Sequence, residues 1–132
     1  DAISDDASLE DTLFDLGKLL LQFTATEKAI IMNRAAVADV PETGLLAAAI
    51  EENARQPTMR FITALMVRLE ESGRCAFDKG AESAARDFFG LLVGELQMQQ
   101  ALGSIPALDS GAIQERARRA SDLFDRLYGI RN

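Results

Sequence analysis

Three polar side chains stand where a helical pattern otherwise places apolar ones, and they are the residues best suited to bind a small molecule. Arg34 projects from an apolar helix face, and Glu95 and Gln99 lie one turn apart inside another apolar sector. Polar groups in such places need hydrogen-bond partners. Arg34 could hold an anionic or carbonyl-bearing ligand, or pair with an acid such as Glu95. Glu95 and Gln99 could line a cavity, pair across an interface or reach water at its rim.

Catalytic residue sets are harder to find. The sequence contains no histidine, which removes Ser-His-Asp and Cys-His catalysis and every metal site that uses histidine. A single cysteine, Cys75, excludes an internal disulfide and fits a reducing compartment. We therefore predict a protein that is not an enzyme, with no catalytic residues, no metal and no cofactor.

Charge and hydropathy narrow the class further. The sequence has 14 basic and 21 acidic residues, a formal charge of −7, whereas direct binding to nucleic acid needs a basic face. No window approaches the run of about 20 apolar residues that a membrane span needs, and no signal peptide is visible. With 132 residues, 48% of them hydrophobic, we expect one compact cytoplasmic domain without membrane contact.

Helical periodicity places these side chains. Ser8 and Thr26 are good N-caps, Pro41 closes an element, and Pro57 marks a helix start or a kink. The pattern predicts an all-α fold, an antiparallel bundle of five to six helices. The expected helices span residues 8–24, 27–39, 42–53, 56–72 and 81–103, with a last helix from 109 or 110 to 128.

The helix expected over residues 81–103 is apolar on most of its sides. Its remaining arc is small rather than polar, because Gly90 and Gly94 lie on it, so another backbone could approach closely there. Such surplus apolar surface favours a subunit interface. The alternative is a central helix wrapped by its own neighbours.

The last 50 residues carry a family resemblance. The stretch AARDFFGLLVGELQMQQALG, a proline-containing loop and the stretch IQERARRASDLFDRLYG closely resemble the last two helices of TetR/AcrR-family transcriptional regulators, in the subgroup with an AefR-like C-terminal domain. Upstream, RAAVAD at residues 34–39 and VPE at residues 40–42 look like further family elements, closer together here than is usual.

The resemblance implies a homodimer in which the last two helices form a four-helix bundle with their counterparts. It also implies a small-molecule effector pocket enclosed by the preceding helices, and operator DNA bound only through an N-terminal helix-turn-helix domain. The sequence lacks that domain, so we expect residues 1–132 to be the effector-binding and dimerisation domain of a repressor. The residues assigned to the dimer interface are Phe88, Leu91, Leu92, Gly94, Leu96, Leu102, Ala117, Ala120, Phe124 and Leu127.

Ligand pockets in helical bundles are mostly apolar with a few placed polar groups. Apolar residues that could line such a pocket, and that plain core packing would explain as well, are Phe23, Ile30, Phe61, Leu65 and Met66. They join Arg34, Glu95 and Gln99 as candidate ligand contacts; Arg34 could also pack against the absent domain. A helical adaptor that binds a protein partner through the same apolar surface remains the alternative function.

Overall fold

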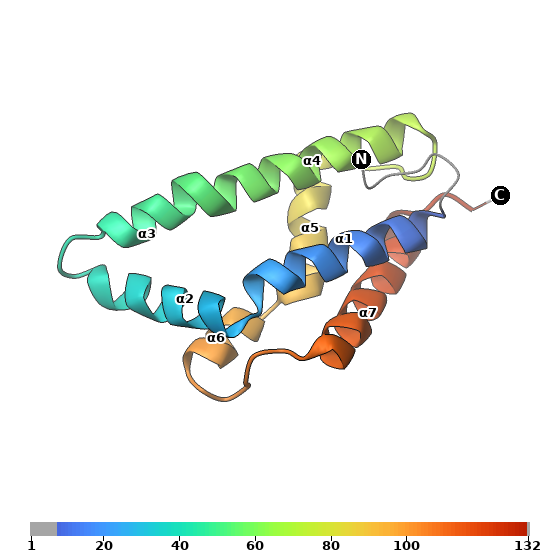
Figure 1. Cartoon of the computed structure of the whole chain (residues 1–132). Coiled ribbons are helices and arrows are strands. Elements are labelled where there is room, and N and C mark those ends of the chain that lie inside the picture. The colour runs from blue at the N-terminus through green and yellow to red at the C-terminus, as the bar shows by residue number, and fades with distance from the viewer. Residues whose placement is uncertain (1–7, 132) are drawn as a thin grey trace.

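The computed structural model describes residues 8–131, and its regular secondary structure over that range is helical (Figure 1). Because α3, η1 and α4 follow one another without a break, they form one long helix, which leaves six helical bodies. The all-α prediction is confirmed. The elements are α1 (Leu9–Thr24), α2 (Glu27–Asp39), α3 (Leu45–Ile50), the π-helical turn η1 (Glu51–Arg55), α4 (Gln56–Glu71), α5 (Ala81–Val93), α6 (Leu96–Ala101) and α7 (Ser110–Tyr128).

Local sequence explains where most helices begin. The Ser8 hydroxyl accepts the Asp11 N–H at 3.1 Å, and the Thr26 hydroxyl accepts the Ala29 N–H at 3.2 Å. The carboxylate of Asp109 accepts the Ala112 N–H at 2.8 Å. Each cap satisfies a backbone donor that has no partner inside its helix.

Two separate helices are expected over residues 42–53 and 56–72, whereas the structure has one continuous helix from Leu45 to Glu71. It begins at Leu45 rather than at residue 42, because Gly44 adopts φ +68° and ends the preceding turn. Pro57 lies in the first turn of α4, as expected, but α4 continues from the π-helical turn η1 without a gap in the helix. The Gln56 N–H bonds the Glu51 carbonyl five residues back, so the wider turn carries the helix past a residue that lacks an N–H.

Figure 1 shows this long helix along one edge of the molecule, with α2 running back beneath its N-terminal half. At the other end, α1 packs most extensively along α7, and α5 contacts both α4 and α7. Gly17 permits the close approach of α1 to α7, since a Cβ there would lie 3.1 Å from both Ala117 Cβ and Leu92 Cδ1.

Aromatic side chains fill the centre of the core. Phe124 is fully buried, and its ring centroid lies 5.6 Å from that of Phe88, 6.0 Å from that of Phe77 and 4.9 Å from that of Tyr128. The C-terminal residues complete this end, because the Ala76 N–H bonds the Tyr128 carbonyl and the Ile130 N–H bonds the Arg74 carbonyl.

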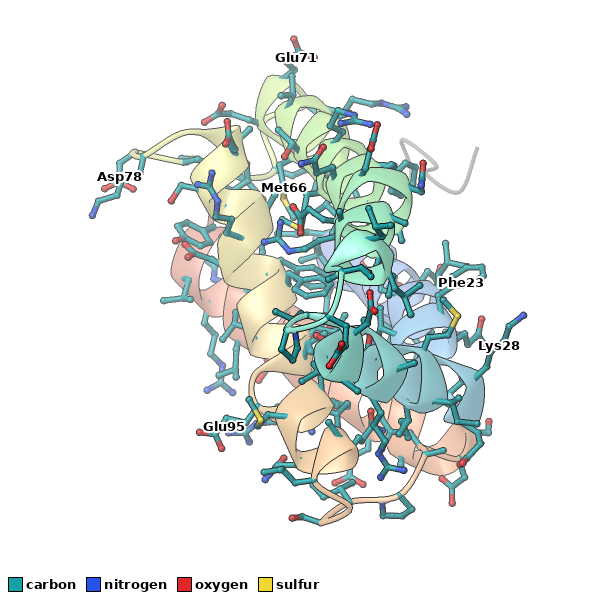
Figure 2. All side chains as sticks on the ribbon, turned by 90° about the vertical axis from the view of Figure 1, so that its left-hand side faces the viewer. Phe23, Lys28, Met66, Glu71, Asp78 and Glu95 are labelled. Atoms are coloured by element: carbon teal, nitrogen blue, oxygen red, sulfur yellow. The ribbon has the colours of Figure 1, made fainter. Side chains whose placement is uncertain are left out.

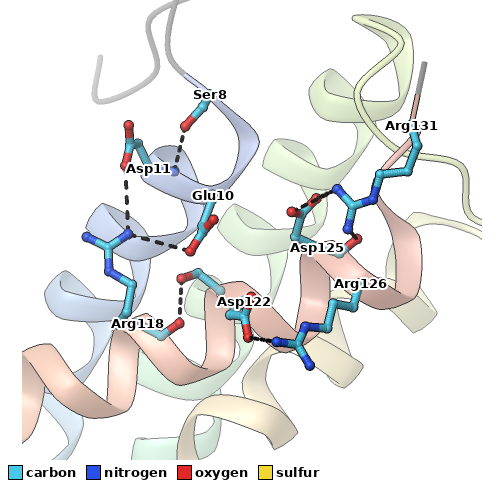
Figure 3. A network of polar contacts seen from close by, with 9 residues as sticks. Ser8, Glu10, Asp11, Arg118, Asp122, Asp125, Arg126 and Arg131 are labelled. Carbon is cyan, nitrogen blue, oxygen red and sulfur yellow. Dashed lines mark hydrogen bonds and ion pairs between the residues drawn. The ribbon is translucent and has the colours of Figure 1, made fainter.

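Ion pairs line the exposed edge where α1 meets α7 (Figure 3). Arg118 lies 3.8 Å from Glu10 and 3.7 Å from Asp11, and its guanidinium stacks 3.7 Å from the ring centre of Phe14. Exposed pairs of this kind contribute little stability. The stacked guanidinium covers the Phe14 ring, which the α1–α7 contact leaves half-buried.

The single helix predicted over residues 81–103 is wrong, because the chain breaks there into α5 and α6. Gly94 adopts φ +52° and ψ −124°, a conformation that glycine reaches without the steric penalty of a side chain. Residues beyond Gly94 therefore leave the helical projection on which Glu95 and Gln99 were placed in an apolar sector. Glu95 is exposed and points away from the bundle (Figure 2), and Gln99 is half-buried.

Candidate dimerisation face and ligand groove

Helices α5 and α7 run antiparallel and share an outward surface. Tyr128, at the end of α7, donates a short hydrogen bond to the Asp87 carboxylate in the middle of α5. Arg116, near the start of α7, reaches the carbonyl of Leu92 at the end of α5. The outward positions of the two helices form the α5/α7 outer face, defined by Ser83, Asp87, Gly90 and Leu91 of α5 and by Arg119, Leu123 and Leu127 of α7.

Gly90 has no explanation within one chain. It lies inside α5, where glycine is less favourable than alanine by about 1 kcal/mol. A Cβ at Gly90 would meet no atom within 4 Å, so no neighbour in the described part of the chain requires the missing side chain. Leu127, on the same outer face, is 63% exposed.

The structure divides the residues expected at the dimer interface. Four remain accessible: Leu91 is half-buried, and Gly94, Leu102 and Leu127 are exposed. The other six are buried in the core of the single chain, where a second copy would not touch them without unfolding; they are Phe88, Leu92, Leu96, Ala117, Ala120 and Phe124. The apolar stripe of the last helix therefore faces α1 and α5 rather than solvent.

Arg116 holds the break between α5 and α6. Its Nε donates to the Leu92 carbonyl at 2.7 Å and its Nη2 to the Val93 carbonyl at 3.0 Å. The turn at Gly94 deprives these carbonyls of helical partners, so the guanidinium replaces the hydrogen bonds that a continuous helix would have made.

A second arginine holds the other end of α6. Arg34 of α2 donates from Nε to the Ala101 carbonyl and from Nη2 to the Gln100 carbonyl, both at 3.0 Å. That Arg34 contacts a ligand stays a prediction. Its guanidinium nevertheless has backbone partners in α6 and makes no recorded ion pair with Glu95 within the described residues.

Gln100 ties α6 to the rest of the core. Its side chain is 2% exposed, and its Nε2 donates to the Ala25 carbonyl at 3.3 Å and to the Pro106 carbonyl at 3.2 Å. The first carbonyl ends α1 and the second belongs to the loop before α7. Sequence reasoning missed both Gln100 and Arg116, because neither interrupts an apolar pattern and their partners are backbone atoms.

The eight candidate ligand contacts do not gather in one place. Ile30, Leu65 and Met66 are buried, and Figure 2 shows Met66 among the packed side chains of the interior. Phe61 is 52% exposed, and Phe23, at 72%, points outward from the end of α1 in the same view. With Arg34 engaged on α6, Glu95 exposed and Gln99 half-buried, these residues do not outline one cavity.

Two surface hollows lie elsewhere. The larger, about 710 Å³, runs between α4 and α5 and is here called the arginine groove; it is lined by Arg55, Gln56, Met59, Arg60, Thr63, Ala64, Glu82 and Arg86. The smaller, about 410 Å³, lies at the opposite end near the first turn of α1 and is lined by Ser8, Leu9, Glu10, Gly73, Arg74, Asp125, Ile130 and Arg131. Neither hollow is lined by any of the eight expected residues.

Two side chains have strongly shifted acid–base properties. The hydrogen bond to Asp87 raises the pKa of Tyr128 to about 12, with burial and the Asp87 charge adding to it. Burial raises the pKa of the Cys75 thiol to about 11, helped by the charges of Asp125 and Glu70. Both groups stay neutral near neutral pH, so neither is poised as a nucleophile or a base.

The described residues include no group of three or more Cys, Asp or Glu side chains placed to hold a metal ion. No helix within residues 8–131 is both long and apolar enough to cross a membrane. The surface features that the structure does show are an open helix-pair face, formed by α5 and α7, and an arginine-lined groove beside it.

This arrangement of helices is that of the C-terminal domain of TetR-family transcriptional regulators. The sequence profile described as "AefR-like transcriptional repressor, C-terminal domain" matches residues 11–130. The chain belongs to this family, whose members are transcriptional regulators rather than enzymes. A search of curated proteins finds no matching relative.

Solved structures agree with the assignment. A TetR transcriptional regulator from Agrobacterium tumefaciens is 30% identical, with a TM-score of 0.80 over 96% of this chain and 63% of that one. A TetR-family regulator from Mesorhizobium loti MAFF303099 (17% identity, TM-score 0.84, 96% of this chain and 62% of that one) shares the fold. So does the flavonoid-responsive regulator FrrA (21% identity, TM-score 0.75, 92% and 61%). The chain spans less than two thirds of each of these proteins.

Proposed function

We propose that this chain is the effector-sensing and homodimerising domain of a TetR-family transcriptional repressor. Two copies associate through the α5/α7 outer face to form a four-helix bundle. A small molecule bound to the domain changes how the two copies are set relative to one another. Operator DNA is bound by a helix-turn-helix domain outside this chain.

Gly90 is the single observation that carries the dimer. No described residue of the same chain needs the side chain of Gly90 to be missing. Close approach by the backbone of a second copy would explain why a glycine stands there. Leu91, Leu123 and Leu127 belong to the same α5/α7 outer face as Gly90 and supply apolar contacts for a partner. A stable dimer of this kind buries about 1,200–2,000 Å² or more in total.

Two considerations support effector sensing. The family consists of repressors, which need a signal to release DNA, and one protein that shares this fold is named for its response to flavonoids. The α2 helix, clamped to α6 by Arg34 and otherwise mostly exposed, offers an element that a ligand could displace. Arg34 and α6 then connect that helix to the break between α5 and α6, which Arg116 of α7 caps.

Light scattering on the purified chain tests the dimer. We expect a dimer at micromolar concentration and a folded monomer for Leu127→Asp, since Leu127 is exposed and its loss leaves the core intact. A wild-type monomer would contradict the proposal. A monomer that captures a different protein through the same face would instead support the helical adaptor.

A thermal-shift screen tests the sensing. A ligand that binds only the native state raises stability by RT ln(1 + [L]/Kd). We expect small amphipathic molecules to raise the midpoint, and a broad library that never shifts it would count against an effector site in this domain.

A further inference from the structure

The arginine groove concentrates positive charge on an acidic protein. The chain as a whole carries −7, yet three arginines line this one hollow: Arg55, Arg60 and Arg86. Two acids lie beside them, Glu82 in the lining and Glu51 as the partner of Arg55. Its volume of about 710 Å³ lies within the range of small-molecule sites, about 300–1,000 Å³. The groove therefore combines the size of a ligand site with a charge opposite to that of the rest of the chain.

Two of the guanidinium groups in the groove pair only with acids on their own helix. Arg55 lies 3.3 Å from Glu51 and Arg86 lies 2.5 Å from Glu82, both as pairs four residues apart on one helix with largely exposed side chains. Such pairs contribute little. Arg60 forms no ion pair or hydrogen bond with the residues that the structure describes. A planar carboxylate, which accepts two parallel N–H bonds from one guanidinium, can displace these partners at small cost.

The groove also has an apolar wall. Met59 and Thr63 are partly buried, with Met59 packed against the core, and Ala64 adds a further methyl group beside them. Methionine side chains adapt to ligands of different shape. An apolar wall below a set of guanidinium groups matches a molecule with an apolar body and one anionic end.

The π-helical turn lies at the end of this groove. Arg55 is the last residue of η1, and Gln56, directly after it, also lines the groove. The wider turn changes the rotation of the helix at this point, and so sets the direction in which Arg55 projects relative to Arg60. Isolated π-turns are found frequently at functional sites.

We propose that the arginine groove is the effector site, and that it takes an amphipathic organic carboxylate. Arg60 and Arg86 hold the carboxylate from α4 and α5, Arg55 adds charge at the end of the groove, and Met59 and Ala64 contact the apolar body. This inference rests on the proposed sensing function, and it assigns that function a site and a class of ligand.

The location of the groove allows a bound ligand to affect the proposed dimer interface. Arg86 lies one turn before Gly90 on α5, so the groove borders the α5/α7 outer face. A carboxylate that draws Arg86 away from Glu82 changes the charge presented beside Gly90. Occupation of the groove therefore alters the surface that the second copy meets.

Isothermal titration calorimetry at low salt tests the site. The probes are phenylbutyrate and octanoate, their uncharged alcohols, and inorganic phosphate. We expect both carboxylates to bind the wild-type chain at least about tenfold more tightly than the alcohols or phosphate. Carboxylate binding should weaken by about tenfold or more in Arg60→Gln and further in the double variant Arg60→Gln/Arg86→Gln.

Arg126→Gln is the matched control, since Arg126 also forms an exposed pair four residues apart, with Asp122, on a helix that does not line the groove. It should bind like wild type. No saturable binding of either carboxylate, equal binding of the alcohols or phosphate, or unchanged binding in the double variant would each overturn the inference. Sedimentation of the same samples separates the two proposals. A dimer that binds no carboxylate contradicts only the proposed effector site, and a monomer that binds carboxylate contradicts only the proposed dimer.

Discussion

The guanidinium of Arg116 lies 2.7 Å from the carbonyl oxygen of Leu92, and this hydrogen bond joins the first half of α7 to the end of α5. The same side chain caps Val93 at 3.0 Å, so one arginine satisfies both carbonyls at the break before Gly94. This contact fixes the antiparallel pair α5 and α7 at the end of α5, and the Tyr128–Asp87 hydrogen bond ties the end of α7 to the middle of α5.

Replacing Arg116 with alanine should lower the free energy of unfolding by about 1–3 kcal/mol, because two partly buried carbonyls lose a charged donor. Urea unfolding at one fixed protein concentration measures the change. Arg126→Ala, at an exposed position of α7 that is not part of the α5/α7 outer face, should stay within about 0.5 kcal/mol of wild type. Equal effects of the two substitutions would show that the cap does not hold the break.

Gln100→Leu should destabilise the domain by about 1–3 kcal/mol, although leucine fits the apolar surroundings. The reason is that Gln100 donates to the Ala25 and Pro106 carbonyls, which would lose their donor inside the protein. Denaturant unfolding checks it, with Gln97→Leu on the same short helix as control. A Gln100→Leu protein as stable as wild type would remove Gln100 from the ties that hold α6.

Gly17→Leu should cost about 1–3 kcal/mol, since even a Cβ at this position would lie 3.1 Å from atoms of Ala117 and Leu92. The larger side chain must push α1 away from α7 or distort Leu92. Thermal unfolding should show a lower midpoint, whereas Gln22→Leu on the exposed side of α1 should change it little. Tolerance of leucine at position 17 would mean that α1 and α7 are not in close contact there.

Tyr128 is the single tyrosine of the chain, so its titration can be followed without ambiguity by tyrosinate absorbance. We expect a pKa of about 12, raised by the hydrogen bond to Asp87, and a return towards about 10 in Asp87→Asn. Because the folded pKa lies above the unfolded value, the associated stability is complete below pH about 10 and disappears as the pH rises towards 12. A wild-type pKa near 10 would contradict the Tyr128–Asp87 contact.

Local signals predicted the helix starts well. Ser8 and Thr26 lie within three residues of the N–H groups that they accept, so short-range sequence contains the whole interaction. The break at Gly94 was missed because glycine inside a helix is only mildly unfavourable and is often tolerated. What makes the break stable is Arg116, which lies 24 residues from Leu92 in the sequence.

Apolar periodicity identified buried positions without saying what buries them. The sequence predicts Phe88 and Phe124 at the dimer interface, whereas the structure buries both at the centre of the core of one chain. Arg34 was recognised as unusual, yet its partners are backbone carbonyls 66 and 67 residues away. Side-chain pattern carries no information about such carbonyls, and the same limit hid Gln100.

Gly90 offers the most direct test of the central claim that two copies meet through the α5/α7 outer face. Sedimentation velocity should show a dimer for the wild-type chain. Gly90→Leu should give a folded monomer, since the added side chain meets open space within one chain but would collide with a closely packed partner. Ala48→Leu, which adds a similar side chain at an exposed position of α3, should remain dimeric. A Gly90→Leu protein that dimerises as tightly as wild type, or a wild-type chain that sediments as a monomer, would contradict the account.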